Sequence, residues 1–109
     1  MKLEEIESFQ ATTRWTITAG DVVRFAGGGP EFVGDDGERH RLTLPGRWRV
    51  KRILRSGRTR HRHFLEVSGI DRTGGTYVVL VHGKPYRSVA GLFIKPYRLK
   101  RAKRETLAR

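Results

Sequence analysis

The stretch from residue 46 to residue 68 constrains this chain more than any other part of its sequence. It reads as two strands joined by a loop at Ser56-Gly57. The segment from Arg47 to Arg62 carries eight cationic side chains and no acidic one. Its apolar positions require a hydrophobic core beneath the hairpin, and its cations favour a negatively charged partner above it.

Alternation along the first strand of this hairpin separates an apolar face from a basic one. Trp48, Val50 and Leu54 fall on the apolar face of a period-two pattern. Arg52 interrupts the pattern, so we expect a β-bulge or an edge position near residues 51–53. The opposite face carries Arg47, Arg49 and Lys51.

The positive charge of the chain is concentrated in its second part. Lysine and arginine total 23 against 11 acidic residues, a formal net charge of +12. Residues 1–46 have a net charge of −3, whereas residues 47–109 have a net charge of +15. Seventeen of the cations are arginine, whose planar guanidinium suits phosphate and base edges. A GC-rich coding sequence would also raise arginine over lysine, but it would not segregate the charge.

Most of the remaining chain predicts short strands separated by glycine-rich turns. The run Thr76–His82 is the most apolar, so we expect it to be a central strand buried on both faces. Asp36-Gly37 marks the turn of a further hairpin. The other predicted strands are 15–18, 22–25, 31–42 (the hairpin) and 93–95.

The two ends of the chain predict extensions of a central domain. Residues 2–10 have apolar side chains at helical spacing, so we expect a short amphipathic helix whose acids lie against the basic part of the chain. The tail either continues as a helix from about Tyr97 or forms a disordered basic arm. The predicted division is an N-terminal helix or arm (1–13), a barrel (14–97) and a basic tail (98–109).

The order of these motifs resembles SH3-like barrels of the KOW and Tudor kind. The segments that carry the resemblance are Gly20–Phe25, Gly46–Val50, Phe64–Val67, Tyr77–Val81 and Phe93–Lys95. The resemblance implies an all-β fold, a small antiparallel SH3-like barrel, with a 3₁₀ turn at Ser88–Leu92 before the last strand. The closing segment from Arg87 to Arg101 also resembles small uncharacterised barrel proteins of actinobacterial phages.

The cations of the hairpin and of the tail are the predicted contacts to nucleic-acid phosphates. Trp48 follows the inward alternation and is assigned to packing. Tyr86 and Tyr97 flank basic residues near turns and are the candidates for stacking on a base. The predicted nucleic-acid-binding residues are Arg47, Arg49, Lys51, Arg55, Arg58, Arg60, Arg62, Tyr86, Tyr97, Lys100, Arg101, Lys103 and Arg104.

No residue pattern indicates catalysis or a bound metal. His61 and His63 would point to one side of a strand, and His40 or Asp71 could complete a metal site, but the neighbouring arginines oppose a dication. The chain has no cysteine. It shows no nucleophile motif and no paired carboxylates in an apolar setting. We therefore expect no metal, no cofactor and no enzymatic activity.

The function that these patterns favour is non-enzymatic binding of DNA or RNA through backbone phosphates. A module that binds an acidic surface of a host protein, and a small structural or assembly subunit, are the alternatives. The acidic N-terminus is unlike a signal peptide, and no run of residues is long and apolar enough to span a membrane. The expected location is the cytoplasm, which would be the host cytoplasm for a phage protein.

Overall fold

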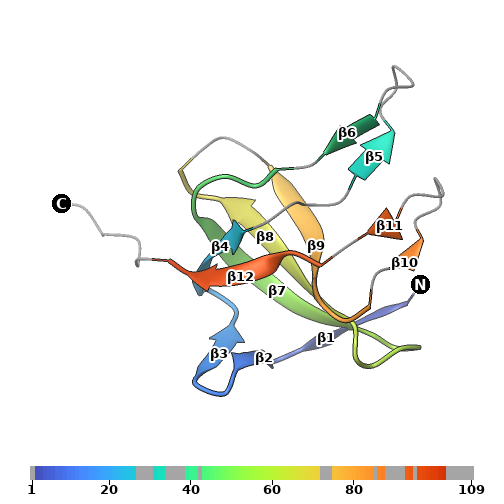
Figure 1. The fold of residues 1–109 in the computed structure, drawn as a ribbon. Coiled ribbons are helices and arrows are strands. Elements are labelled where there is room, and N and C mark those ends of the chain that lie inside the picture. The colour runs from blue at the N-terminus through green and yellow to red at the C-terminus, as the bar shows by residue number, and fades with distance from the viewer. Residues whose placement is uncertain are drawn as a thin grey trace.

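The computed structural model describes residues 2–26, 31–33, 39–41, 43–71, 75–84, 86–87, 93–94 and 96–102 of the 109-residue chain. Every regular element in these ranges is a β-strand, and every strand pair is antiparallel (Figure 1). No helix in them has the length and apolarity needed to cross a membrane. The strands are β1 (Leu3–Ile6), β2 (Ser8–Thr12), β3 (Trp15–Thr18), β4 (Val22–Ala26), β5 (Glu31–Val33), β6 (Arg39–Arg41), β7 (Trp48–Ser56), β8 (His63–Gly69), β9 (Thr76–His82), β10 (Tyr86–Arg87), β11 (Phe93–Ile94) and β12 (Arg98–Arg101).

The nine-residue strand β7 is the centre of the main sheet, whose order is β12-β4-β7-β8-β9 with β1 also paired to β7. One edge of β7 pairs with β8 from Trp48 to Arg55. The other edge is divided, since β4 pairs with its first two residues and β1 with its last four. At about 3.3 Å per residue, nine residues span roughly 30 Å, which is long enough to take two strands end to end. Three two-stranded sheets, β2–β3, β5–β6 and β10–β11, complete the described part.

The predicted bulge in this strand is confirmed. The register between β7 and β8 shifts between Val50 and Arg52, which leaves Lys51 as the extra residue. The shift changes which side chains reach the core. Trp48, Val50 and Ile53 lie in the main cluster of buried residues, whereas Leu54 lies in a different one. The expectation that Leu54 shares the face of Trp48 is therefore wrong, because a one-residue insertion reverses the facing of every later side chain.

The main sheet buries apolar side chains on both of its faces. The larger cluster includes Ile17, Val23, Leu65 and Val67, none of which is accessible to solvent. The smaller cluster consists of Leu54, Phe64 and Leu80, which are cross-strand neighbours on β7, β8 and β9.

The predicted strand at residues 76–82 is confirmed as β9, but its expected central position is wrong. In the sheet order β9 is the last strand, and it pairs only with β8 among the described strands. Val79, Leu80 and Val81 are buried, whereas Val78 is 48% exposed. The apolar run arises because a bulged edge strand contributes to both clusters, not because the strand is flanked on both edges.

The expected N-terminal helix is wrong. Its residues form β1 and β2 instead. As a helix of this length the segment would be marginal in isolation, whereas as a strand β1 satisfies the free edge of β7. The expectation that its acids lie against the basic part of the chain is confirmed, since Glu4 and Glu5 lie beside Arg55 and Arg52 of β7.

The sheet does not close into a barrel within the described residues. Its outer strands β9 and β12 have no ladder between them, and one backbone hydrogen bond, from Tyr97 N to the carbonyl oxygen of Leu80 at 2.9 Å, joins their ends. Residues 98–101 form a strand paired with β4, so the helix considered from Tyr97 is wrong. The strands predicted at 15–18 and 22–25 and those of the 31–42 hairpin are confirmed. The expected turns at Asp36-Gly37 and at Ser88–Leu92 fall outside the described residues.

Gly83 provides a test of how β9 is joined to the loop between β7 and β8. Its φ is +119°, and a Cβ placed there would lie 2.9 Å from both Arg62 Cγ and the carbonyl oxygen of His61. Gly75 has a φ of +75° with nothing within 4 Å of such a Cβ. We expect Gly75→Ala to lower the free energy of unfolding by about 1–2 kcal/mol through the left-handed backbone alone.

Gly83→Ala should cost a further ~1–3 kcal/mol because its Cβ overpacks against backbone. Urea unfolding of the two variants measures the difference. Equal losses in the two variants would contradict the close approach of the loop to Gly83.

Candidate nucleic-acid interface

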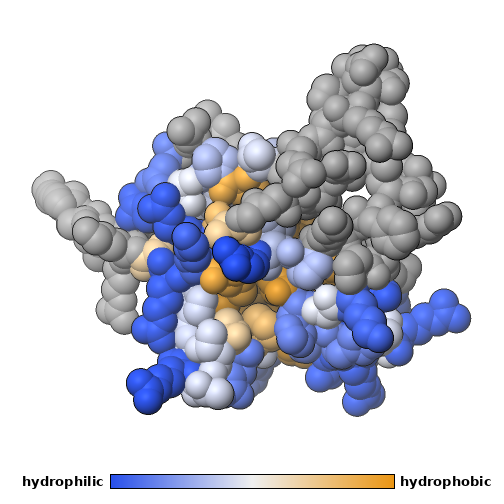
Figure 2. Space-filling view, viewed as in Figure 1, coloured by the Kyte–Doolittle hydropathy of each residue, from blue (hydrophilic) through white to orange (hydrophobic). Residues whose placement is uncertain are grey.

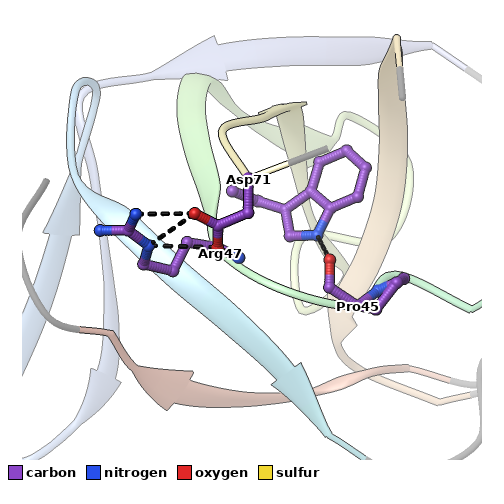
Figure 3. A network of polar contacts seen from close by, with 4 residues as sticks. Pro45, Arg47 and Asp71 are labelled. Atoms are coloured by element: carbon purple, nitrogen blue, oxygen red, sulfur yellow. Dashed lines mark hydrogen bonds and ion pairs between the residues drawn. The ribbon is translucent and has the colours of Figure 1, made fainter. Parts of the chain in front are cut away.

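Arg47, a predicted phosphate contact, is held in an ion pair (Figure 3). Its Nη2 lies 2.6 Å from Asp71 Oδ1, and its backbone N donates to Asp71 Oδ2 at 2.8 Å. The hydrogen bonds from Arg47 lower the pKa of Asp71 from 3.8 to about 2. Beside this pair the indole N–H of Trp48 donates to the carbonyl oxygen of Pro45, which anchors the start of β7. The guanidinium of Arg47 therefore has a partner within the chain.

Two further arginines of β7 are also paired with acids. Arg52 Nε donates to Glu66 Oε1 at 2.6 Å and its Nη1 lies 3.9 Å from Glu5, whereas Arg55 Nη2 lies 3.5 Å from Glu4. The hydrogen bond from Arg52 lowers the pKa of Glu66. The hairpin thus presents less unneutralised charge than its sequence indicates.

The loop between β7 and β8 holds two exposed arginines, Arg58 and Arg60, without an ion-pair partner in the described part of the chain. The loop is built on Ser56, which is fully buried and whose Oγ accepts a hydrogen bond from Thr59 N at 3.1 Å. Backbone bonds from Ser56 N to Arg62 O and from Arg62 N to Thr59 O close it. The two guanidinium groups therefore project from an ordered turn.

A second group of cations lies on the outward face of β4 and β12. Lys100 is directly opposite Arg24 in the register, and both are exposed. Arg98, two residues before Lys100, lies on the same face and is also exposed. Arg49, on the adjacent strand β7, donates to the carbonyl oxygen of Gly20 at 2.9 Å. Like charges directly opposite one another destabilise a sheet, so this arrangement favours an anion bound between them.

Sequence reasoning identified Lys100 but missed Arg24 and Arg98. Arg24 could have been identified because it directly follows the buried Val23, so alternation along β4 places its side chain on the outward face. Its pairing with Lys100 joins residues 76 positions apart, and alternation within one strand contains no information about such pairing.

Two of the other predicted residues have roles within the fold. Tyr97 is 3% exposed and packs against Phe25 with ring centroids 5.2 Å apart, so its assignment as an open stacking platform is wrong. Arg101 lies over the indole of Trp15, 5.5 Å from the ring centroid, and its Nη2 donates to the carbonyl oxygen of Arg14 at 2.8 Å. The side chain of Tyr86, and residues Lys103 and Arg104, lie outside what the structure describes.

A pocket of about 520 Å³ opens between the β2–β3 hairpin and β12, where β9 and β12 diverge. In Figure 2 apolar surface lies in the middle of the visible face with hydrophilic residues around it. The apolar part of the lining consists of aromatic and aliphatic side chains, and its polar part includes two histidines and two cations. The lining residues are Phe9, Ala11, Thr12, Trp15, His61, Val81, His82, Gly83, Lys84, Pro96, Tyr97, Arg98 and Leu99.

Two β-bulges shape this pocket. The register of β2 against β3 shifts between Gln10 and Thr12, which makes Ala11 an extra residue. The register of β8 against β9 shifts so that Val81 is extra on β9. Successive side chains of a regular strand point to opposite faces, but at each bulge two neighbours, Ala11 with Thr12 and Val81 with His82, line the same pocket.

Phe9 connects the pocket to two histidines. Its ring stacks on His63 with centroids 4.8 Å apart, and His82 lies 5.7 Å from both rings. Burial lowers the pKa of His63, and the nearby His82 and Arg55 lower it further. His63 therefore stacks behind Phe9 as a mainly neutral ring at pH 7 and is not a phosphate contact. No three His, Cys, Asp or Glu side chains gather in a metal-binding arrangement among the residues that the structure places.

The ion pair of Asp71 predicts a specific pH dependence of stability. Because its pKa is about 2 in the folded chain, below its ordinary value of 3.8, Asp71 stabilises the fold above about pH 4. That contribution disappears as the pH falls from about 4 to 2. We expect Asp71→Asn to be less stable than the parent chain at pH 7, and most of the difference to be gone by pH 2.

Urea unfolding of both chains between pH 2 and pH 7 measures this difference. Glu66→Gln removes the other carboxylate with a lowered pKa. It serves as the control for effects of low pH on stability that are not specific to Asp71. A difference between the parent and Asp71→Asn that is constant across this range would contradict the assignment.

Comparison with protein-family models, with curated proteins and with solved structures finds no match to this chain.

Proposed function

We propose that this chain is a non-enzymatic nucleic-acid-binding protein that contacts backbone phosphates. The observation that carries the proposal is the exposed cross-strand pair Lys100 and Arg24, with Arg98 beside it. Three cations on one face of two paired strands repel one another, and bound phosphates would remove that repulsion. Of the acids that form ion pairs in the described chain, Glu4, Glu5 and Glu66 pair with β7 and Asp71 pairs with Arg47, although the charge of Asp71 also acts on Arg24.

The proposed contacts differ from those that the sequence alone predicts. Arg24 and Arg98 replace Arg47 and Arg55 as proposed contacts, because Arg47 and Arg55 are held in ion pairs. Arg24 and Arg98 are exposed and form no ion pair among the described residues, and the charge of Asp71 acts on Arg24 only from a greater distance. Arg58 and Arg60 on the β7–β8 loop, and Lys100 on β12, are retained. Arg49, Lys51 and Arg62 add positive charge to the hairpin between these two groups.

The fold supports the same proposal in a general way. SH3-like barrels, which the motif order resembles, bind RNA, DNA, peptides and protein tails, so the resemblance permits a nucleic acid without selecting it. The two groups of cations lie near opposite ends of the roughly 30 Å strand β7. That separation suits a polymer with regularly spaced phosphates better than it suits a small anion. We place this binding in the cytoplasm.

The salt dependence of binding tests the proposal. We expect the parent chain to bind short oligonucleotides with micromolar or tighter affinity at 0.15 M salt, and log K to fall linearly with log salt. Arg24→Gln combined with Lys100→Gln should reduce the slope on duplex DNA by about 1.8, since each lost phosphate contact contributes about 0.9. Fluorescence anisotropy of a labelled 16-mer at four salt concentrations measures the slope.

The control is Arg52→Gln combined with Arg55→Gln, which removes the same net charge from residues that are already ion-paired. A binding surface made of the unpaired cations predicts a smaller change of slope in the control. Equal changes in the two double variants would show general attraction to a basic protein and would overturn the assigned surface. Loss of all binding at 0.15 M salt would overturn the proposed function itself.

A further inference from the structure

We propose that the pocket between the β2–β3 hairpin and β12 holds one unstacked base of a single-stranded nucleic acid. This inference rests on the proposed function and deepens it, because it names the class of nucleic acid.

The size and apolar walls of the pocket suit a flat aromatic ring. Its volume of about 520 Å³ lies within the ~300–1,000 Å³ range typical of small-molecule sites. Trp15 supplies the accessible aromatic surface, whereas Phe9 and Tyr97, which are 7% and 3% exposed, contribute only small parts of the wall. Val81 and Leu99 supply aliphatic surface. Stacking of bases on such side chains is tolerant of sequence because every base has a π face.

The charged side chains around these walls are the cations Lys84 and Arg98. Lys84 and Arg98 are exposed where they line the pocket, and no lining residue is acidic. An acidic or zwitterionic aromatic ligand is compatible with this charge. In a nucleotide, the base can contact the apolar walls while the adjacent phosphate contacts Lys84 or Arg98. Thr12 and His82 add hydroxyl and imidazole groups that can hydrogen-bond to the edge of an unpaired base.

The side of the pocket nearest Trp15 is already organised. Arg101 covers the indole and is itself held by the carbonyl oxygen of Arg14. Arg14 N in turn donates to Thr12 Oγ1 at 3.2 Å, across the turn between β2 and β3. Trp15 and Thr12 are therefore fixed relative to each other before a ligand arrives, which reduces the entropy lost on binding.

The position of the pocket also explains why we expect the nucleic acid to be single-stranded. Its lining comes from His61 in the β7–β8 loop at one side and from Arg98 and Leu99 of β12 at another, so the site lies between the two groups of cations. A nucleic-acid strand that contacts both groups of cations passes over the pocket. A base in a duplex would first have to leave its stack, at a cost of a few kcal/mol, whereas an unpaired base enters without that cost.

The test compares four ligands on the full chain at 0.15 M salt: a single-stranded dT12, the same length of duplex, a dT12 with abasic sites in place of its central bases, and free dTMP. Binding is followed by anisotropy and by the fluorescence of Trp15. Trp48, the other tryptophan, is 3% exposed and supplies a constant background. We expect dT12 to bind about tenfold more tightly than the duplex and to quench Trp15.

Two variants separate the pocket from the phosphate contacts. Ala11→Leu fills the pocket from its bulge without removing a charge, and Trp15→Leu removes the largest aromatic wall. Each is expected to weaken dT12 binding about tenfold and to leave duplex binding and its salt slope unchanged. Unaltered duplex binding also shows that a variant is folded, and Ala11→Leu keeps the test valid should Trp15→Leu fail to fold.

The outcomes are distinct. Equal binding of single strand, duplex and abasic strand, with no effect of either pocket variant, overturns the pocket assignment and leaves the proposed function standing. Quenching by free dTMP at the affinity of dT12 overturns the assignment to a strand. Absence of binding by any oligonucleotide overturns the proposed function and this inference with it.

Discussion

The hydrogen-bonded edges of β7 are the constraint on which the rest of the structure depends. One edge is filled by β8, and the other is filled by two separate segments, β4 and β1. Between those segments the backbone groups of Val50 bond to Gly20 and Asp21. The chain therefore leaves little of this edge unpaired, and the N-terminal residues become a strand because β7 supplies the partner that a short helix lacks.

The same pairing organises the charge. In the sequence an acidic N-terminal part precedes a strongly basic part, and in the fold Glu4 and Glu5 of β1 lie beside the arginines of β7. The acids thus neutralise the strand next to them and leave the loop and the β4–β12 face positive. The charge segregation that first indicated a nucleic-acid partner is partly an internal requirement of the sheet, and only the remaining cations support that partner.

Local patterns predicted most of the strands, whereas non-local pairing determined the site. Alternation identified β3, β4 and β7, and the cation at Arg52 located the bulge. The bulge places Leu54 on the opposite face of the sheet from Trp48. Predicting this from the sequence would have required the position of the bulge to within one residue. Neither the ion pair of Asp71 with Arg47 nor the opposition of Lys100 and Arg24 is readable from the sequence, since both depend on register between distant segments.

The opening between β9 and β12 connects the fold to the proposed site. A closed barrel would pair these strands along their length, but among the described residues no ladder joins them, and Tyr97 N donates to the carbonyl oxygen of Leu80. A sheet with unpaired edges is exposed to unwanted pairing, and bulges are one device that turns an edge away from it. The bulge at Val81 does so on β9 and, with the bulge at Ala11, directs side chains into the gap. The two bulges therefore place side chains in the pocket that lies beside this open edge of the sheet.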